Sequence, residues 1–201
     1  MPEIHNLLLS IDEQLLLFVN GLNTPILDVS MLHFSGKLFW LPLYVFLVAV
    51  IIKKHGIKKG VLSLVLLALM IWATDQLSSS VIRPLICRLR PSSPLNPISE
   101  LLYFVNDSRG GTYGFPSSHA ANSCALAAFL ILLLKRRWLS VTLIFWAILV
   151  SGSRIYLGFH YPTDILAGGI LGIGLGYCFY NIFKFLTSIK LFAPYLGHIP
   201  D

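Results

Sequence analysis

The chain has 201 residues, which suits a single domain, and 56% of them are hydrophobic while 12% are charged. Soluble domains carry about 25% charged residues, so this composition excludes an ordinary soluble fold and predicts an integral membrane protein. The net charge of +6 therefore does not indicate nucleic-acid binding, and the informative feature is where the basic residues lie relative to the apolar segments.

Residues 3–20 begin the chain with apolar side chains near one helical face, while Asp12 and Glu13 fall among the polar positions. Acidic groups argue against a deep membrane span, so we predict a helix that lies at the membrane surface. A short helix over 25–34 should follow the break at 23–25. These interfacial helices make up a predicted N-terminal segment, residues 1–35.

Five apolar segments follow, and each is long enough to span or nearly span a bilayer. They cover residues 36–53, 60–81, 117–134, 138–151 with its continuation toward Arg154, and 164–183. We predict an all-α membrane bundle of about five transmembrane helices over residues 36–190, then a C-terminal tail, 191–201. The proline- and glycine-rich stretch 84–116 should form a structured surface region.

Two further patterns define the bundle. Gly168, Gly172 and Gly176 recur at helical spacing and predict close contact between the last helix and a neighbour. Nine of the 15 Lys and Arg residues fall on one predicted side: Lys53, Lys54, Lys58, Lys59, Lys135, Arg136, Arg137, Lys184 and Lys190. The positive-inside rule makes that side cytoplasmic, so the polar segments gather on the outer side.

The outer side carries the segment SRIYLGFHYPTD, residues 153–164, between two apolar stretches. Charged groups next to hydrocarbon are costly and usually have a task. Pro162 suits the first turn of a helix, which places His160 just before that helix and Asp164 in its first turn. A carboxylate at this spacing can accept the Nδ1–H of the imidazole and leave Nε2 free as a base or nucleophile.

Cations and hydroxyl groups from other segments should reach the same place. The phosphate-binding candidates are Arg83, Arg90, Ser117, Ser118 and Arg154. Guanidinium groups match phosphate oxygens, and the N-terminus of the helix that begins near Ser117 can point N–H groups at the same anion. Arg83 and Arg90 are seven residues apart, so both would face one site if their helix continues.

A second histidine, His119, completes a site for phosphoryl transfer. His160 would attack phosphorus, while His119 would protonate the leaving oxygen and later activate water. The arginines would stabilise charge on the phosphoryl oxygens, a task that Mg²⁺ performs in many phosphoryl-transfer enzymes. Acidic residues near the site are few, so we predict no metal and no cofactor.

Three motifs carry a family resemblance: Arg83-x6-Arg90-Pro91, then Pro116 to His119, then Ser153-Arg154-x5-His160-x3-Asp164. They are similar to the signature of the type 2 phosphatidic acid phosphatase superfamily, which includes the vanadium haloperoxidases. There are two departures: arginine stands at 83 where the family has lysine, and serine at 118 where it has glycine. Membrane members commonly have six spans, so residues 3–20 could form a sixth.

The resemblance implies a membrane lipid phosphatase with a phosphohistidine intermediate. The preferred substrate is undecaprenyl pyrophosphate; the alternatives are phosphatidylglycerol phosphate, phosphatidic acid and the lipid A 1-phosphate. Localisation in a bacterial inner membrane is expected, with the site on the periplasmic face and no obligate protein partner. Two remote alternatives are an anion transporter and a serine hydrolase using Ser117 or Ser118. A transporter would need inverted repeats, and the sequence shows none. A serine hydrolase would leave the three arginines without a role.

Overall fold

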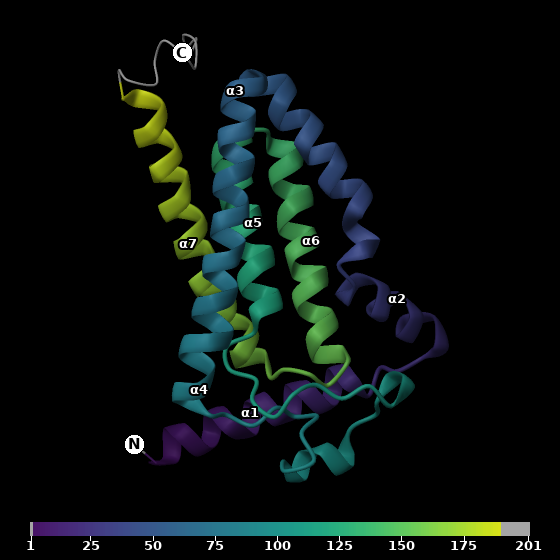
Figure 1. Cartoon of the computed structure of the whole chain (residues 1–201). Helices are drawn as coiled ribbons and strands as arrows, with labels where there is room; N and C mark the ends of the chain where they lie inside the picture. Colours follow the sequence, from purple (N-terminus) through teal and green to yellow (C-terminus); the bar gives the residue numbers. More distant parts are fainter. Residues whose placement is uncertain (1, 190–201) are drawn as a thin grey trace.

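The computed structural model describes residues 2–189, and the predicted tail 191–201, with Lys190, lies outside the described residues. Helix α1 (Pro2–Asn20) lies across one end of a bundle of long helices (Figure 1), as the prediction of a surface helix requires. Helix α2 (Pro25–Ser35) begins at the N-cap Thr24. The axes of 9–20 and 25–35 differ by 116°, so the two helices are not one straight span.

The first two predicted spans are the arms of one assigned helix, α3 (Leu41–Asp75), which follows a 3₁₀ turn, Leu38–Trp40. The chain reverses at Gly56, where φ is +75°, and Figure 1 shows the two arms as a hairpin. Glycine tolerates this left-handed conformation because it has no Cβ. The predicted connector 53–59 is therefore mostly helical, with a break confined to one residue.

Beyond α3 the chain stays helical through a π-helical segment (Gln76–Ile82) and α4 (Arg83–Ile86). The helix then ends at Cys87, whose backbone is left-handed with φ +51°. The premise that one helix carries both Arg83 and Arg90 is therefore wrong. Arg90 instead reaches the site from an irregular segment, next to the isolated antiparallel bridge between Leu89 and Tyr113.

The surface region was predicted over 84–116, but its first residues belong to α4; the irregular segment covers 87–117, with short 3₁₀ helices at Pro97–Leu101 and Val105–Asp107. Three long apolar helices follow: α5 (Ser118–Leu134), α6 (Arg137–Tyr156) and α7 (Pro162–Ser188). By length and hydropathy, 38–86, α6 and α7 can each cross a membrane. Because 38–86 folds back at Gly56, it contributes two arms to the bundle, and the shorter α5 runs beside them (Figure 1).

Helix α5 is the centre of the bundle and packs against α3, α6 and α7. The predicted glycine stripe explains how α7 approaches so closely: a Cβ on Gly172 would lie 2.1 Å from the carbonyl oxygen of Ala121. The apolar core includes Leu67, Met70, Phe129, Leu130, Leu134, Leu139, Leu143 and Trp146. Close backbone contact stabilises helix pairs in lipid, where apolar burial between helices gains little.

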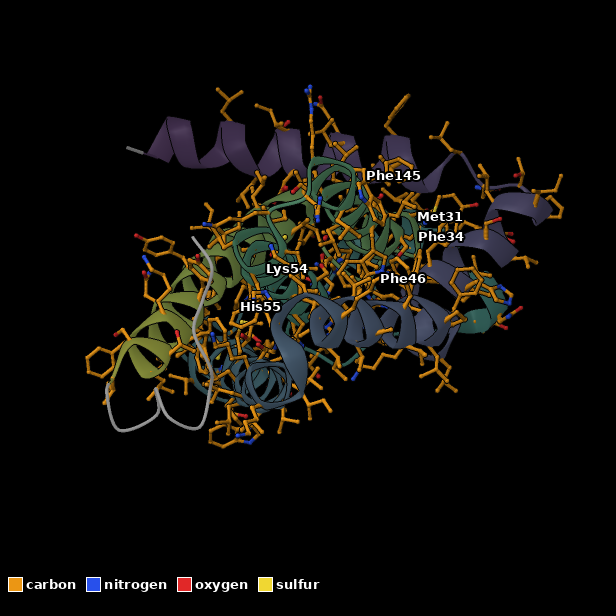
Figure 2. All side chains as sticks on the ribbon, turned by 90° about the horizontal axis from the view of Figure 1, so that it is seen from above. Met31, Phe34, Phe46, Lys54, His55 and Phe145 are labelled. Carbon is orange, nitrogen blue, oxygen red and sulfur yellow. The ribbon has the colours of Figure 1, made fainter. Side chains whose placement is uncertain are left out.

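The two ends of the bundle differ in charge. One end, called here the basic end, carries the turn of α3 and the α5–α6 connector, 135–136, with most of the basic residues. There Lys54 Nζ donates to the carbonyl oxygens of Leu133 and Leu134 at 3.3 and 2.5 Å, and His55 lies 3.2 Å from the former oxygen. Figure 2 shows Lys54 and His55 near the middle of the bundle in projection.

The opposite end, called here the site end, contains α1 and the 87–117 segment (Figure 1). Leu16 of α1 packs with Ile98, Leu102 and Tyr161, so the N-terminal helix shares a small core with the surface segment. A second small core joins α2 to the end of α6 through residues such as Met31 and Tyr156. The division at residue 35 stays a prediction, since both N-terminal helices pack on the site end.

Candidate active site

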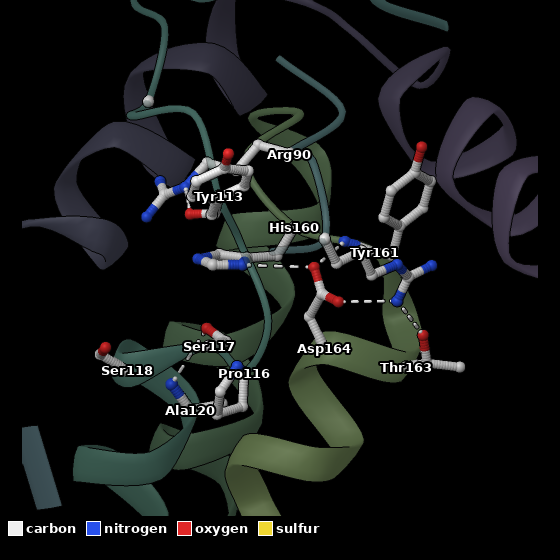
Figure 3. Close-up of polar contacts among 12 residues, drawn as sticks. Arg90, Tyr113, Pro116, Ser117, Ser118, Ala120, His160, Tyr161, Thr163 and Asp164 are labelled. Carbon is white, nitrogen blue, oxygen red and sulfur yellow. Dashed lines mark hydrogen bonds and ion pairs between the residues drawn. The ribbon is translucent and has the colours of Figure 1, made fainter. Parts of the chain in front are cut away.

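The site is built around the start of α7, as the sequence predicts. Pro162 occupies the first turn, and Tyr161 is the N-cap, whose backbone N–H donates to Asp164 Oδ2 at 3.0 Å. His160 precedes the helix and is 1% exposed. Its Nδ1 lies 3.5 Å from Asp164 Oδ2, an ion-pair distance that is longer than a good hydrogen bond. Figure 3 shows the two side chains facing each other.

The surroundings of His160 favour the neutral imidazole. Burial is the main cause that lowers its pKa well below the ordinary value, and the positive charges of Arg90 and Arg154 act in the same direction. Nδ1 has no hydrogen-bond partner among residues 2–189. A neutral ring keeps a lone pair on one nitrogen, which a nucleophile or base needs.

Arg90 reaches this centre from the loop. Its Nε donates to the carbonyl oxygen of Tyr113 at 2.8 Å. Burial lowers the pKa of Arg90 to about 10, so the guanidinium stays charged at neutral pH. Two glycines make room for it: a Cβ on Gly110 would lie 2.3 Å from Arg90 Nη1, and one on Gly114 would lie 2.9 Å from Arg90 Cγ. This packing brings Arg90 next to the carboxylate of Asp164.

Arg83 enters from α4 and meets the start of α5. Its Nη2 donates to Ser118 Oγ at 2.8 Å and to the carbonyl oxygen of Pro116 at 3.2 Å. Ser78 Oγ lies 2.9 Å from the same Ser118 oxygen. The hydroxyl of Ser117 caps α5 by accepting from Ala120 N at 3.5 Å. Both serine hydroxyls thus have partners within the protein, and their contact with phosphate stays a prediction.

Arg154 lies in the last turn of α6 and is 9% exposed. Its Nη1 donates to Ser35 Oγ, and its guanidinium lies over the ring of Phe159, 4.2 Å from the centroid. Its Nε is buried and has no hydrogen-bond partner in the part of the chain that the structure describes. A buried guanidinium with an unused donor, near two histidines, can bind an anion.

His119 lies in the first turn of α5, within electrostatic range of His160 and Arg154. It also lines a cavity of about 410 Å³ between the arms of α3, α5 and α6. The end of this cavity next to the start of α5, called here its mouth, is lined by polar side chains: Lys37, Asp75, Ser118, His119 and Asn122. The deeper walls are apolar and include Trp40, Leu47, Ile51, Leu67, Leu130 and Trp146. The cavity therefore joins the candidate chemistry to a hydrocarbon-like interior.

The sequence reasoning missed two residues. Arg88, which the sequence analysis did not assign to the site, forms ion pairs with Asp164 at 2.7 Å and with Asp12 at 2.5 Å. Asp12 comes from α1 and is 2% exposed. The signal was present as an acid in an amphipathic helix, but without its partners it indicated only that the helix stays shallow. Arg109, a further cation of the 87–117 segment, lies over the ring of Phe104.

Within residues 2–189, no group of three or more His, Cys, Asp or Glu side chains is arranged to hold a metal ion. The positive charges that act on His160 are those of Arg83, Arg90 and Arg154. The site therefore offers guanidinium groups where many other phosphoryl-transfer sites offer a metal ion such as Mg²⁺. Metal independence stays a prediction until chelation is tested.

Residues 60–188 match the model of the PAP2 superfamily, and the chain belongs to this family. It is 48% identical to a lipid A 4′-phosphatase of Bacteroides thetaiotaomicron over 89% of this chain and 79% of that protein. It is 31% identical to a lipid A 4′-phosphatase of Porphyromonas gingivalis over 95% of this chain and 80% of that protein.

A further relative is phosphatidylglycerophosphatase B of Bacillus subtilis, with 31% identity over 80% of this chain and 74% of that protein. The fold resembles the crystal structure of a transmembrane PAP2 type phosphatidylglycerolphosphate phosphatase from the same organism, with a TM-score of 0.69 and 24% identity, over 92% of this chain and 90% of that one. The protein is thus a membrane-embedded lipid phosphatase, a hydrolase. Neither the transporter nor the serine hydrolase alternative is retained.

Proposed function

We propose that the protein hydrolyses a phosphate monoester of a lipid A-type glycolipid, at the 4′ position. The observation that carries a phosphatase mechanism is the buried His160, which faces Asp164 amid the positive charges of Arg83, Arg90 and Arg154. The 4′ position is supported by the two lipid A 4′-phosphatases that match most of the chain. The preference for undecaprenyl pyrophosphate is not supported by them.

In the proposed reaction, Nε2 of His160 attacks phosphorus as the bond from phosphorus to the lipid oxygen breaks. His119 gives its proton to that leaving oxygen. Water, deprotonated by His119, then attacks the phosphohistidine; the P–N bond breaks and inorganic phosphate leaves. Asp164 orients the imidazole and stabilises the charge that it acquires.

The arginines supply the electrostatic part of the mechanism. Arg83, Arg90 and Arg154 would bind the non-bridging oxygens, on which negative charge grows in the transition state. Their guanidinium groups are already held by Ser118, Tyr113 and Ser35. Groups that are fixed before the reaction need little reorganisation when the charge develops. Ser117 and Ser118 would add contacts from the start of α5.

The cavity supports a lipid substrate because its polar mouth contains His119 and its walls are apolar. From Ser118 to Leu130 it follows α5 for about 18 Å, given a rise of about 1.5 Å per residue. We infer that one acyl chain enters this space while the phosphate stays at the mouth. The bilayer itself is then the other partner of the protein.

The site end would face the periplasm of a bacterial inner membrane. This orientation rests on the basic residues of the basic end, which the positive-inside rule assigns to the cytoplasm. The exposed thiol of Cys87 at the site end provides a test. A membrane-impermeant thiol reagent should label Cys87 in spheroplasts, and the Cys87→Ser variant should lose this label. Labelling of Lys58→Cys in that variant should require inside-out vesicles; the reverse pattern would contradict the orientation.

Phosphate release from a panel of lipids tests the substrate. The purified protein should release phosphate faster from lipid A with a 4′-phosphate than from lipid A with a 1-phosphate. His160→Ala should abolish release from both. Equal rates at the two positions, or faster release from undecaprenyl pyrophosphate, would contradict the proposed selectivity while leaving the phosphatase mechanism in place.

A second candidate substrate is phosphatidylglycerol phosphate. It is favoured by the similarity to phosphatidylglycerophosphatase B of Bacillus subtilis, which covers 80% of this chain. Phosphatidic acid and undecaprenyl pyrophosphate complete the panel, because they share the combination of a phosphate with long apolar chains. Fastest release from phosphatidylglycerol phosphate would favour this candidate over the glycolipid.

A further inference from the structure

A buried carboxylate of α1 takes part in the charge network behind the candidate nucleophile. Asp12 Oδ2 pairs with Arg88 Nη2 at 2.5 Å, and the other arm of the same guanidinium, Nη1, pairs with Asp164 Oδ1 at 2.7 Å. Asp12 Oδ1 also accepts from the backbone N–H of Thr163 at 2.9 Å. Asp12 and Asp164 are 2% and 0% exposed. Arg88 Nη1 also donates to Thr163 Oγ1 at 2.6 Å, and Figure 3 shows Thr163 next to Asp164 at the start of α7.

The geometry fixes which face Asp164 presents to His160. One carboxylate oxygen, Oδ1, is held by Arg88, and the other, Oδ2, accepts from Tyr161 N and lies 3.5 Å from His160 Nδ1. A guanidinium fork can hold two anions at defined angles, so Asp12 fixes Arg88 and Arg88 fixes Asp164. A change at Asp12 would therefore reach the imidazole through two ion pairs.

We propose that Asp12 and Arg88 are positioning residues, which hold Asp164 in the orientation that sets the imidazole of His160. The inference rests on the proposed function, in which His160 attacks phosphorus. Neither residue touches the phosphate; both act through Asp164. The N-terminal helix is then part of the catalytic apparatus, and not only an attachment to the membrane.

Asp12 is not needed to attach α1 to the bundle. Leu16 and Asn20 lie on the same face of α1, one and two turns further on, and already attach the helix. Leu16 enters an apolar cluster, and Asn20 exchanges hydrogen bonds of 2.9 Å with the backbone of Tyr103. Burying a carboxylate is costly, and an apolar residue could dock this helix at less cost. We therefore assign the charge of Asp12 to holding the guanidinium of Arg88 in place.

The test begins with Asp12→Asn, which keeps an oxygen for Thr163 N–H and removes the charge that holds Arg88. With lipid A bearing a 4′-phosphate, and with phosphatidic acid, kcat should fall about ten- to a hundredfold, as when outer partners of catalytic groups are removed. KM should change less than about twofold, because phosphate binding is untouched. Glu13→Gln, an equal charge change at an exposed neighbour, is the matched control and should keep full activity.

Arg88→Ala provides a second measurement, in which an added ion can replace the missing group. Non-denaturing guanidinium chloride should restore part of kcat in this variant, because the ion can occupy the vacated place between the two carboxylates. Sodium chloride at the same concentration should not. Asp12→Asn added to Arg88→Ala should lower kcat by less than about twofold further, since both residues act in one chain.

An unchanged kcat in Asp12→Asn, or a rise in KM alone, would overturn the proposal. Failure of guanidinium to restore a folded Arg88→Ala variant would also count against it. The underlying mechanism fails separately: His160→Ala with wild-type activity would remove the nucleophile itself. If His160→Ala is inactive while Asp12→Asn is fully active, the positioning role alone is rejected.

Discussion

The side chains of Arg83 and Ser118 are hydrogen-bonded, with 2.8 Å between Nη2 and Oγ. These are the two positions at which the chain departs from the lysine and glycine of the superfamily motifs. The two departures therefore contact each other: the hydroxyl of Ser118 accepts a hydrogen bond from the guanidinium of Arg83. Ser78 contacts the same hydroxyl at 2.9 Å, so the arrangement also joins the π-helical segment to α5.

This contact predicts that the two substitutions depend on each other. Ser118→Gly alone should lower kcat/KM about tenfold, because a hydrogen bond to a charged group contributes about 1.5–3 kcal/mol and Arg83 is only half-buried. Arg83→Lys alone should lower it similarly. The double variant restores the usual lysine–glycine pair. Its kcat/KM should therefore be higher than the value expected if the free-energy losses of the two single variants simply added. Simple additivity in this double-mutant cycle would contradict the coupling.

A neutral, buried His160 also predicts how stability depends on pH. The folded pKa lies below the ordinary value, so the unfolded chain binds more protons than the folded one between the two pKa values. Stability contributed by the neutral ring is therefore present above about pH 6.5 and is lost as the pH falls, at up to about 1.4 kcal/mol per pH unit. Thermal unfolding of detergent-solubilised protein at several pH values would measure it.

The matched variant for that measurement is His160→Asn, which has no titrating group at this position. Its stability should fall less between pH 7.5 and pH 5 than that of the wild type, a range that begins about one unit above the usual histidine pKa. Parallel curves for the two proteins would show that His160 is not held neutral.

A metal-free mechanism predicts that hydrolysis persists in excess chelator. The positive charges near His160 are arginines, which a chelator does not remove. Rates with and without chelator should agree within about twofold, because removal of an essential ion would cost far more. Activity that is lost on chelation and restored by Mg²⁺ would refute this prediction.

Vanadate offers an independent check of the same site. It adopts the trigonal-bipyramidal shape of the phosphoryl-transfer transition state, and the arginines and His160 should bind it. We expect competitive inhibition in phosphate-release assays, and weaker inhibition of Arg90→Ala, since Arg90 lies against the buried centre. Equal inhibition of wild type and variant would place vanadate elsewhere.

Close packing of α5 and α7 predicts a contrast between two glycines of the same helix. Gly172→Ala should destabilise the protein by about 1–3 kcal/mol, the range for overpacking, because its Cβ would lie 2.1 Å from Ala121 O. Gly174→Ala should be tolerated, since nothing lies within 4 Å of its Cβ. Thermal unfolding measures both. Equal stabilities would contradict the close approach.

The helices and their caps are local features, and the sequence predicted them well. Pro162 and Asp164 specify the start of α7, and the glycines at 168, 172 and 176 specify its packing face. The break at Gly56 was harder to place, because the basic residues around it resemble an ordinary connector. Arg90 was assigned to the site for the wrong reason, since local spacing could not show that the helix ends at Ile86.

The sequence by itself determined an all-α membrane bundle and predicted a histidine–arginine centre, because hydropathy, charge bias and motif spacing are written along the chain. The tertiary structure decided which charges meet. Asp12 and Asp164 are 152 positions apart, yet one guanidinium joins them at 2.5 and 2.7 Å. Such a contact depends on how α1 lies across the bundle, and no local pattern encodes the partner of a buried carboxylate.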